Sequence, residues 1–586
     1  ADNFCWLAGN PGSCVLRSPD QGRSWELLHT GQSLPIHAMK FVDQRRGWAV
    51  GALGMILATQ DGGDTWQAQR SGGGRAALLG LFGEGSEVPL ELLARYCGDE
   101  GYLGVVESLT RRDVETSSAA ATSAEQRLAA GVLAASGSYA NATWRFPLRQ
   151  AGLKMTAESI AQGWSLANGA DGNEVLDEYL VLRLRQWRPD VLVTRASDPR
   201  RPDPLTQLVN QAVLRATKQA ADPTAYADQI RVLGLEPWQV KKVCAVADGE
   251  GTGLMAIDTA QLATRLGRSI HEHATQSYGL LRERWAPVAS RRGIELLTSN
   301  APSAVAGRDL FSGIVIPYAS EARRAEGHPQ ATSLTELRRA TQKQRVVEIL
   351  LTRAAGDAEN LAAWSAQIDE LTRELSPQAG GDILYQLAQH YREIGRYELA
   401  CESLQHLLRK YPTHSLSDAA VTWCFEYFAS EEVGHAFGKQ PAIDSHLVQQ
   451  ASAAQALNAA LPPSVDHKLE VTHYDSRAAK AGFDAPADAT DPLERLLYQA
   501  ESIQQLRPAL LADPRLRFAV AAAYRKQGHV HAANRLYQQV AGSQPFDAWR
   551  QSAHGELWLT SRKGNSPKPL LSCQRVAEKP FLDGKL

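Results

Sequence analysis

The chain of 586 residues has no long apolar run and no excess of either charge, and each absence excludes a class of protein. Its longest apolar runs, such as residues 76–82, are far shorter than the roughly 18 residues that a membrane-spanning helix needs. Lys and Arg total 62 against 64 Asp and Glu, so the chain lacks the basic surface of a general nucleic-acid binder. We therefore expect neither a membrane span nor a nucleic-acid partner.

Cysteine and histidine are sparse where a metal site would need them. The seven cysteines are scattered without a CxxC pair, which excludes a zinc ribbon and a dense disulfide framework. Cys5 and Cys14 flank a turn, where they are either joined across a hairpin or simply two small apolar residues. None of the 15 histidines lies between His37 and His271, although a catalytic zinc site normally includes at least one.

The remaining composition is that of a folded protein, with 44% hydrophobic and 22% charged residues. The length predicts about three or four domains. A repeat opens the chain and consists of Asp20, Gly22 and Trp25 and, 41 positions later, Asp61, Gly63 and Trp66. A period near 40 with short apolar strands is typical of propeller blades. We expect each Asp to accept backbone N–H bonds in its own turn, each Gly to supply a positive φ and each Trp to pack beneath the hairpin.

These stretches resemble the Asp-box (BNR) repeat, most closely its photosystem II stability/assembly factor-like version. The resemblance rests on Phe-Val-Asp-Gln-Arg-Arg-Gly-Trp-Ala-Val-Gly at 41–51 and Asp-Gly-Gly-Asp-Thr-Trp at 61–66. It implies β-propeller-type blades over residues 1–72 and a structural role for the boxes, which lie at blade corners remote from catalytic sites. Two blades cannot close a ring, so the other blades are expected upstream, in another copy, or not at all.

The Gly-rich residues 71–75 predict a flexible joint, after which strands alternate with helices. The predicted strands are 76–82, 102–109 and 190–194, and the predicted helices are 88–96, 123–135, 176–187 and 205–219. This alternation predicts a parallel, doubly wound, Rossmann-like sheet. Ligands of such sheets lie beyond the carboxyl ends of the strands, here near 83–87 and 195–203.

Four segments of this region, in order, resemble the PIG-L/LmbE family of zinc-dependent N-acetylglucosaminyl deacetylases. They are Gly-Asp-Glu-Gly-Tyr-Leu-Gly-Val-Val-Glu-Ser-Leu-Thr at 98–110, Arg-Pro-Asp-Val-Leu-Val-Thr at 188–194, Glu-Pro-Trp-Gln-Val-Lys-Lys-Val at 236–243, and Ile-Asp-Thr at 257–259 with His-Ala-Thr-Gln at 273–276. The resemblance covers about 75–285 and implies an α/β domain at 75–318.

The family's metal ligands are missing from this chain. The family has His-Pro-Asp-Asp after its first strand, where residues 82–87 read Phe-Gly-Glu-Gly-Ser-Glu. Its second element, His-x-Asp-His, corresponds to a stretch in which Pro204 stands at the last ligand, and proline offers no lone pair. We expect no catalytic residue, no cofactor and a lost zinc site. The candidate vestigial cleft comprises Glu84, Glu87, Arg195, Asp198, Asp203 and His273.

The alternative is an active hydrolase whose metal site is rebuilt from Glu84, Glu87, Asp198 and Asp203. Such carboxylates suit a hard cation such as Ca²⁺, although solvated loop carboxylates are the simpler interpretation. His273 lies two residues after His271 on a predicted helix, so the two side chains point apart. We expect His273 to be a structural hydrogen-bonding residue.

Residues 332–560 have helical spacing and contain two tetratricopeptide (TPR)-like patterns. The first comprises Leu387, Ala388, Tyr391, Gly395, Tyr397, Ala400, Leu404 and Pro412, and the second Val520, Ala521, Tyr524, Gly528, Val530, Ala533, Tyr537 and Pro545. They predict a TPR-like α-solenoid, with an unrelated helical bundle as the alternative. Residues 579–586, Lys-Pro-Phe-Leu-Asp-Gly-Lys-Leu, resemble the first strand of the family 9 carbohydrate-binding module. This implies a linker and the start of a β-sandwich at 565–586.

The predicted fold class is thus multidomain α and β: propeller-type blades, a Rossmann-like α/β domain and a TPR-like solenoid. The predicted function is that of a non-catalytic scaffold or binding protein with a pseudo-deacetylase domain. A protein partner is expected through the TPR-like repeats, and a glycan is a further candidate ligand. The resemblances to Asp-box and sugar-binding proteins imply a periplasmic or extracellular location.

Overall fold

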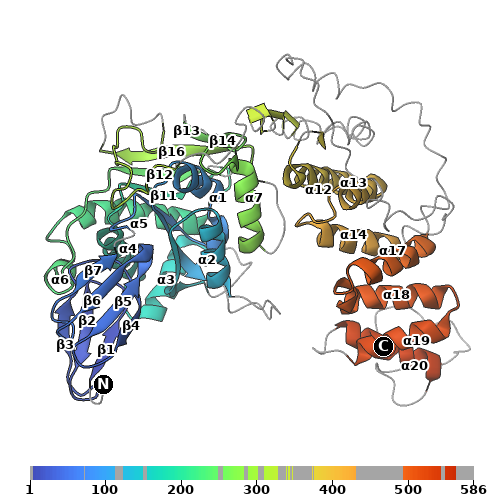
Figure 1. Cartoon of the computed structure of the whole chain (residues 1–586), viewed down its shortest axis with the longest axis horizontal. Coiled ribbons are helices and arrows are strands. Elements are labelled where there is room, and N and C mark those ends of the chain that lie inside the picture. Colours follow the sequence, from blue (N-terminus) through green and yellow to red (C-terminus); the bar gives the residue numbers. More distant parts are fainter. Residues whose placement is uncertain are drawn as a thin grey trace, which may run out of the picture. The chain divides into compact units, whose positions relative to one another are not determined.

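The computed structural model describes most of the chain and divides it into two compact units, Ala1–Arg345 and Val346–Leu586. The described residues are 4–70, 73–111, 123–148, 155–198, 200–247, 255–282, 288–300, 309–327, 338–339, 341–343, 346–347, 372–373, 375–430, 492–542 and 548–562. Figure 1 shows both units, the first mixed α/β and the second helical, which confirms the predicted fold class in its coarse form. Among the described helices, none has the length and apolar character needed to cross a bilayer.

Residues 4–70 form two antiparallel sheets (blue in Figure 1). We call them the Asp-box module after the repeat that their sequence resembles, and we call the turns at 18–25 and 59–66 its first and second box. Their strands are β1 (Cys5–Ala8), β2 (Cys14–Ser18) and β3 (Glu26–His29) in one sheet, and β4 (Ile36–Phe41), β5 (Gly47–Gly51), β6 (Ile56–Thr59) and β7 (Gln67–Arg70) in the other. By the sequence repeat, β1–β3 correspond to β5–β7, and the strand pairing is the same. Trp6 lies opposite Arg17, and Trp48 lies opposite Ala58. Cys5 and Cys14 are both free thiols.

The α/β domain contains a seven-stranded sheet in the order β10-β9-β8-β11-β12-β16-β13. The first five strands in this order run parallel, and β16 and β13 are antiparallel to their neighbours. The strands are β8 (Leu78–Phe82), β9 (Gly104–Arg111), β10 (Tyr139–Pro147), β11 (Val191–Arg195), β12 (Lys242–Val246), β13 (Met255–Asp258) and β16 (Arg291–Ser299); a separate two-stranded ribbon comprises β14 (Leu262–Ala263) and β15 (Arg268–Ser269).

Helices cover both faces of this sheet. They are α1 (Leu90–Leu93), α2 (Ala124–Ala134), α3 (Ala157–Asn168), α4 (Gly172–Trp187), α5 (Pro204–Ala221), α6 (Ala227–Arg231) and α7 (Ile270–Leu281). Along β8, Leu78 and Phe82 belong to one apolar core with α1, α2 and α7, whereas Leu79 and Leu81 belong to a second core with α3, α4 and α5. Because successive strand residues point to opposite faces, a continuous apolar run is what a sheet covered on both sides needs.

The connection between the module and the α/β domain corrects one sequence prediction. Residues 71–72 lie outside the described residues, but the rest of the predicted flexible joint is anchored. Gly74 N–H donates to the Glu321 carbonyl at 2.8 Å, and Arg75 forms ion pairs with Asp190 and Glu321. The module also shares the second apolar core of the domain, and Ser33 Oγ donates to the Gln186 carbonyl at 2.8 Å. The module is therefore packed on the domain. The prediction of a flexible joint from the glycine content of residues 71–75 is wrong for residues 73–75.

The described part of the second unit consists of helices. They are α12 (Pro377–Glu393), α13 (Tyr397–Lys410), α14 (Ser417–Ala429), α17 (Pro492–Leu506), α18 (Pro514–Lys526), α19 (Val530–Ala541) and α20 (Ala548–Ser561). Short turns join α12 to α13, α13 to α14, α17 to α18 and α18 to α19. The turns between α12 and α13 and between α18 and α19 contain Gly395 (φ +76°) and Gly528 (φ +83°), a backbone conformation that favours glycine. The small residues of the two patterns, Ala400 and Ala533, are buried where the paired helices approach each other. Pro545 and the segment 565–586 lie outside the described residues.

Candidate functional site

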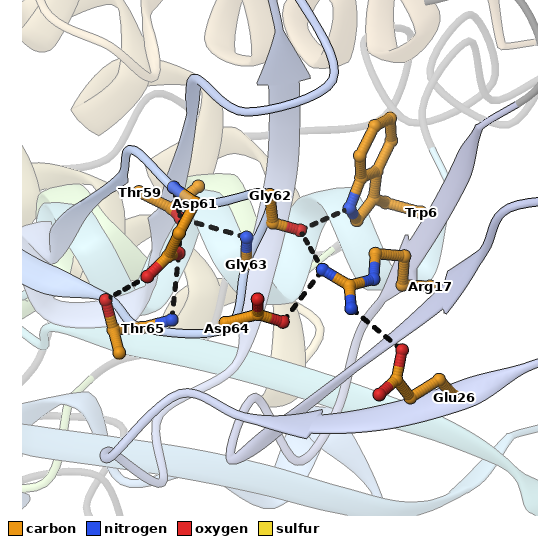
Figure 2. A network of polar contacts seen from close by, with 9 residues as sticks. All are labelled: Trp6, Arg17, Glu26, Thr59, Asp61, Gly62, Gly63, Asp64 and Thr65. Carbon is orange, nitrogen blue, oxygen red and sulfur yellow. Dashed lines mark hydrogen bonds and ion pairs between the residues drawn. The ribbon is translucent and has the colours of Figure 1, made fainter.

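The second Asp box forms a closed local network of hydrogen bonds. The Thr65 backbone N–H and hydroxyl donate to the two carboxylate oxygens of Asp61, at 2.9 and 2.5 Å. Thr59 Oγ1 donates to the same carboxylate at 2.7 Å and accepts the Gly63 N–H at 2.9 Å. Gly63 has a φ of +103°, which favours glycine at this position. Figure 2 shows that all partners of Asp61 come from one turn.

The first box repeats this network with serine in place of threonine. The Ser24 N–H and hydroxyl donate to Asp20 at 2.8 and 2.7 Å, Ser18 Oγ donates to it at 2.8 Å, and Gly22 has a φ of +90°. The hydrogen bonds from Ser24 lower the pKa of Asp20 to about 2. Burial opposes ionisation of Asp61, but the bonds from Thr65 and Thr59 outweigh it and also lower that pKa to about 2. Both carboxylates are thus charged acceptors that hold their own turns.

The two box tryptophans, which the sequence predicts beneath their hairpins, differ in exposure. Trp66 is half-buried and packs on the second apolar core. Trp25 is 41% exposed, and its indole N–H donates to the Gly22 carbonyl at 3.1 Å within the same turn. Each ring lies against the glycine of its own turn, because a Cβ at Gly22 or Gly63 would lie 3.6 Å from Cζ2 of Trp25 or Trp66. Trp66 also meets the second apolar core, so Trp25 is the more exposed of the two.

Trp6 and Arg17 join the first repeat to the second box (Figure 2). The Trp6 indole N–H donates to the Gly62 carbonyl at 2.9 Å, and its ring stacks on Phe41 with centroids 3.8 Å apart. The Arg17 guanidinium contacts Asp64 at 2.8 Å and the same Gly62 carbonyl at 3.3 Å. The box is thus a junction between the repeats as well as a turn.

In the α/β domain, the structure brings together two of the predicted cleft residues, Glu87 and Arg195. Glu87 follows β8, Arg195 ends β11, and the two side chains form an ion pair. Burial raises the pKa of Glu87, and the charge of Arg195 opposes that shift. The space beside this pair is closely packed, since a Cβ at Gly83 would lie 2.8 Å from Leu205 Cδ2.

The other predicted carboxylates serve local turns. Asp203 caps α5, because its carboxylate accepts the Thr206 N–H at 2.9 Å and the Thr206 hydroxyl at 2.6 Å. Pro204 begins that helix, where a residue without an N–H is tolerated. Asp198 accepts the Arg200 N–H at 2.8 Å, and Glu84 begins the short turn that contains Glu87.

His273 does not belong to the predicted cleft. Its Nε2 lies 3.0 Å from Ser136 Oγ, and Ser136 precedes β10, close to the amino end of the sheet where Ser138 N–H donates to the Gly104 carbonyl. The cleft residues lie at the opposite, carboxyl end of the strands. Burial, followed by the charge of Arg268, lowers the pKa of His273 to about 4, so it is neutral at pH 7. It is held as a hydrogen-bonding residue between α2 and α7.

These residues do not fit the zinc that the family resemblance implies. Arg195 places a positive charge beside Glu87, and a second cation there would be repelled. Asp203 is engaged by the first turn of α5, and the next residue is a proline. Among the described residues, no group of three His, Cys, Asp or Glu side chains is arranged to hold a metal ion. Glu84, Glu87, Asp198 and Asp203 are all described, so they form no such group.

Two of the segments that resemble the deacetylase family, 188–194 and 236–243, meet at the amino end of the strands. The Trp238 indole N–H donates to the Pro189 carbonyl at 2.7 Å, which joins the 236–243 segment to the 188–194 segment. Asp190 is buried and paired with Arg75 at 2.5 Å and Lys241 at 2.7 Å. These segments therefore support the sheet at the end opposite to the cleft.

A buried network around Glu107 was not predicted. Glu107 lies in β9 with no exposed surface, and its carboxylate accepts from Trp187 Nε1 at 2.9 Å, Tyr179 Oη at 3.1 Å and Asn141 Nδ2 at 2.8 Å. Arg183 Nε lies 3.7 Å from the same carboxylate. The sequence did carry a signal of this network. Glu107 is the one charged residue in the largely apolar run 103–109, and a buried carboxylate needs several hydrogen-bond donors.

Comparison with known proteins identifies one part of the chain. The tetratricopeptide repeat family matches residues 382–414, which cover most of α12, all of α13 and the turn after it. Among curated proteins, no sequence matches the chain.

Two similar solved structures are a conserved protein from Thermus thermophilus and GalB, the 4-carboxy-2-hydroxymuconate hydratase from Pseudomonas putida. The first is 15% identical, covers 36% of this chain and 80% of its own, and has a TM-score of 0.25. The second is 12% identical, covers 39% of this chain and 98% of its own, and has a TM-score of 0.24. At these values the likeness carries no argument about fold or function. The TPR-like prediction is confirmed for its first repeat.

Proposed function

We propose that this chain is a non-catalytic, multidomain scaffold or binding protein. In this proposal the Asp-box module consists of propeller-type blades and the α/β domain is a Rossmann-like pseudo-deacetylase. The helical unit is a TPR-like solenoid that binds a protein partner, and a glycan is the candidate ligand of the α/β domain. The predicted periplasmic or extracellular location remains part of this proposal.

The ion pair between Glu87 and Arg195 carries the proposal. Metal-dependent amide hydrolysis needs a Lewis acid beside the scissile carbonyl and a carboxylate that activates water. Here the carboxylate that follows β8 is neutralised by a guanidinium from the end of β11, and a guanidinium cannot accept a proton at neutral pH. The end of the sheet at which such chemistry would occur is thus held together by an ion pair.

The fold assignment of this domain draws support from its topology. A central β8 is flanked by β9 and β10 on one side and by β11 and β12 on the other, so the strand order reverses at β8. The helices of the first two connections, α1 and α2, lie on one face of the sheet, and those of the next two, α3, α4 and α5, lie on the other. Both features are typical of doubly wound sheets, whose ligands bind at the point of reversal.

The protein-binding part of the proposal rests on the repeat match at 382–414. TPR-type repeats stack helix pairs and leave extended surfaces that bind other proteins. The first residues of α13 and α19, Tyr397 and Val530, occupy equivalent positions and are 50% and 41% exposed. Exposed apolar side chains at matching positions of both helix pairs are what a partner-binding surface needs.

The test is a metal and activity measurement on the full chain. We expect purified protein to hold less than stoichiometric zinc and to show no deacetylation of N-acetylglucosamine oligosaccharides when zinc is added. Stoichiometric zinc, together with turnover that disappears in Glu84→Gln or Asp203→Asn, would overturn the proposal in favour of the rebuilt-site hydrolase. Lys241→Gln is the matched control, because Lys241 pairs with Asp190 at the other end of the sheet.

A further inference from the structure

A shallow depression of about 580 Å³ lies on the outer side of β10, the edge strand of the large sheet. It is separate from the Glu87–Arg195 pair, borders the Glu107 network through Asn141 and Arg183, and is the size of a small-ligand site. The side chains at its rim are Trp144, Thr143, Asn141, Asn168, Glu125 and Asn10. Asn10 comes from the Asp-box module, and the other five come from the α/β domain.

Trp144 is the most unusual residue of this depression, because it is 64% exposed. The register between β10 and β9 shifts between Ala142 and Phe146, so the residues between them bulge away from the ladder. Ala142 and Phe146 themselves are 8% and 0% exposed and anchor both ends of the bulge. The bulge thus places an indole at the depression while Ala142 and Phe146 stay in the core.

The bulge is also held from outside the strand. Asn168 Nδ2 donates to the Arg145 carbonyl at 3.0 Å and to the Trp164 carbonyl at 2.9 Å, which joins the bulge to the end of α3. Thr143 Oγ1 accepts the Arg145 N–H at 3.2 Å. These bonds fix the backbone that carries the indole, so a ligand that stacks on Trp144 loses little affinity to ordering of the strand.

Three of the polar side chains beside Trp144 are amides, Asn10, Asn141 and Asn168. Asn141 uses its Nδ2 for Glu107, and Asn168 uses its Nδ2 for backbone carbonyls, so each presents its amide oxygen as an acceptor. Asn10 supplies both a donor and an acceptor. Neutral groups that both donate and accept are the partners that hydroxyl groups need.

The charges of the depression do not favour an anion. Glu125 and Arg145 carry opposite charges, and Arg183 at the base is only 7% exposed and lies beside Glu107. A nucleic acid or phosphate ligand would require a basic surface. A proline-rich peptide would require a groove lined by several aromatic rings, whereas Trp144 is the one aromatic among the described residues that line this depression.

We propose that this depression binds a neutral saccharide, with the apolar C–H face of one pyranose ring stacked on Trp144 and its hydroxyls bound by Asn141, Asn168 and Asn10. A pyranose fits this surface because one of its faces is apolar and its edge is a ring of hydroxyl groups. The inference rests on the proposed function in that it gives the glycan ligand of the α/β domain a site. It places that site at the edge strand, away from the Glu87–Arg195 pair.

The experiment is isothermal titration calorimetry of the full chain with three neutral tetrasaccharides, cellotetraose, maltotetraose and chitotetraose. We expect at least one of them to bind. Trp144→Ala should weaken that binding about tenfold or more, and Trp144→Phe, which keeps a ring, should restore part of it. Trp48→Ala is the matched control, because Trp48 is a similarly exposed indole (43%) that does not line the depression.

Each of three outcomes would overturn the inference. One is that no tetrasaccharide binds at millimolar concentration, and another is that Trp144→Ala and Trp48→Ala change binding equally. Binding of a polyproline peptide or single-stranded DNA that only Trp144→Ala abolishes, with no saccharide bound, would overturn it as well. Thermal unfolding tests whether both variants are folded. We expect both to be folded, because both indoles are exposed.

The inference and the proposed function can fail separately. Zinc-dependent turnover that depends on Glu84 or Asp203, combined with saccharide binding that depends on Trp144, would overturn the pseudo-deacetylase proposal and support this site. Absence of turnover combined with absence of saccharide binding would leave the non-catalytic proposal in place and remove this site.

Discussion

The two Asp-box repeats have the same turns but bury opposite faces. In the first repeat, Leu7 and Leu16 are 54% and 37% exposed. Their equivalents in the second repeat, Ala49 and Leu57, are 0% and 4% exposed. The strand pairing is the same, since Leu7 lies opposite Leu16 and Ala49 lies opposite Leu57.

The reason is the neighbour that each face meets. The other face of the first repeat, which carries Trp6, Val15 and Arg17, packs on the second repeat through Phe41 and the second box. Equivalent residues are therefore buried or exposed according to their place in the series of repeats. A repeat determines its own turn, but its neighbours determine which of its faces becomes core.

The largest difference in the free energy of unfolding between the two repeats should come from the same substitution made at Leu57 and at its equivalent, Leu16. Leu57→Asp introduces a charge into an apolar core and should lower the free energy of unfolding by about 4 kcal/mol or more. Leu16→Asp lies on a half-exposed face and should change it by about 0.5 kcal/mol. Urea unfolding of the full chain, followed by tryptophan fluorescence, measures both. Equal losses would show that the exposed face of the first repeat is covered in solution.

The next contrast concerns the tryptophans at equivalent strand positions. Trp6→Ala removes the stacking on Phe41 and the hydrogen bond to Gly62, and should cost about 2 kcal/mol because the indole is partly buried. Trp48→Ala removes a 43% exposed indole and should cost less than about 1 kcal/mol. Calorimetric unfolding of the two variants provides the comparison. A larger loss at Trp48 would contradict the assignment of the interface between the repeats.

A smaller effect is expected at Arg17, whose equivalent is Ala58. Arg17→Ala removes partly exposed ion pairs with Asp64 and Glu26 and should cost about 0.5–1 kcal/mol. Ala58→Arg should not raise the free energy of unfolding, because among the described residues that face of the second repeat meets no further box. The loss in Arg17→Ala should shrink in 1 M NaCl, since salt screens exposed charges. A loss that salt does not change would assign the effect to the Gly62 hydrogen bond instead.

The smallest difference is expected in the acid titration of the two boxes. The pKa values of Asp20 and Asp61 both fall from the ordinary 3.8 to about 2 in the folded chain. Their stabilising contribution is thus present above pH 3.8 and is lost as the pH falls toward 2. Carboxyl carbon shifts followed by NMR between pH 5 and 1.5 measure both values. Asp20→Asn and Asp61→Asn should each remove one of the two transitions, and a normal pKa at either site would show that its turn is open.

The sequence was a good guide wherever the partners of a residue lie close to it in the chain. The bounds predicted for strands and helices of the α/β domain agree with the observed bounds to within a few residues. Examples are 102–109 for Gly104–Arg111 and 205–219 for Pro204–Ala221. The paired helices at 382–414 follow from small and large residues at helical spacing. Predicted helix 88–96 is split into α1 and a wider π-type turn, Ala94–Asp99, a distinction of hydrogen-bond spacing that apolar periodicity does not encode.

The candidate cleft was predicted less well, because its residues are brought together by topology. Glu87 and Arg195 are 108 residues apart and meet because β8 and β11 are neighbours in the sheet. His273 was grouped with them from a family-like segment, whereas its helix places it at the opposite end of the strands. The Trp144 depression draws on the Asp-box module, on α2, on β10 and on the end of α3, so no single stretch of sequence could indicate it.

The sequence by itself determined the turns, the periodic elements and the absence of the histidines that a zinc site would need, since these depend on residues within one or two turns of each other. Tertiary structure alone decided which apolar face is core, which carboxylate faces a guanidinium and which indole faces solvent. The physical reason is that burial and charge pairing depend on the surface opposite. That surface comes from a distant part of the chain.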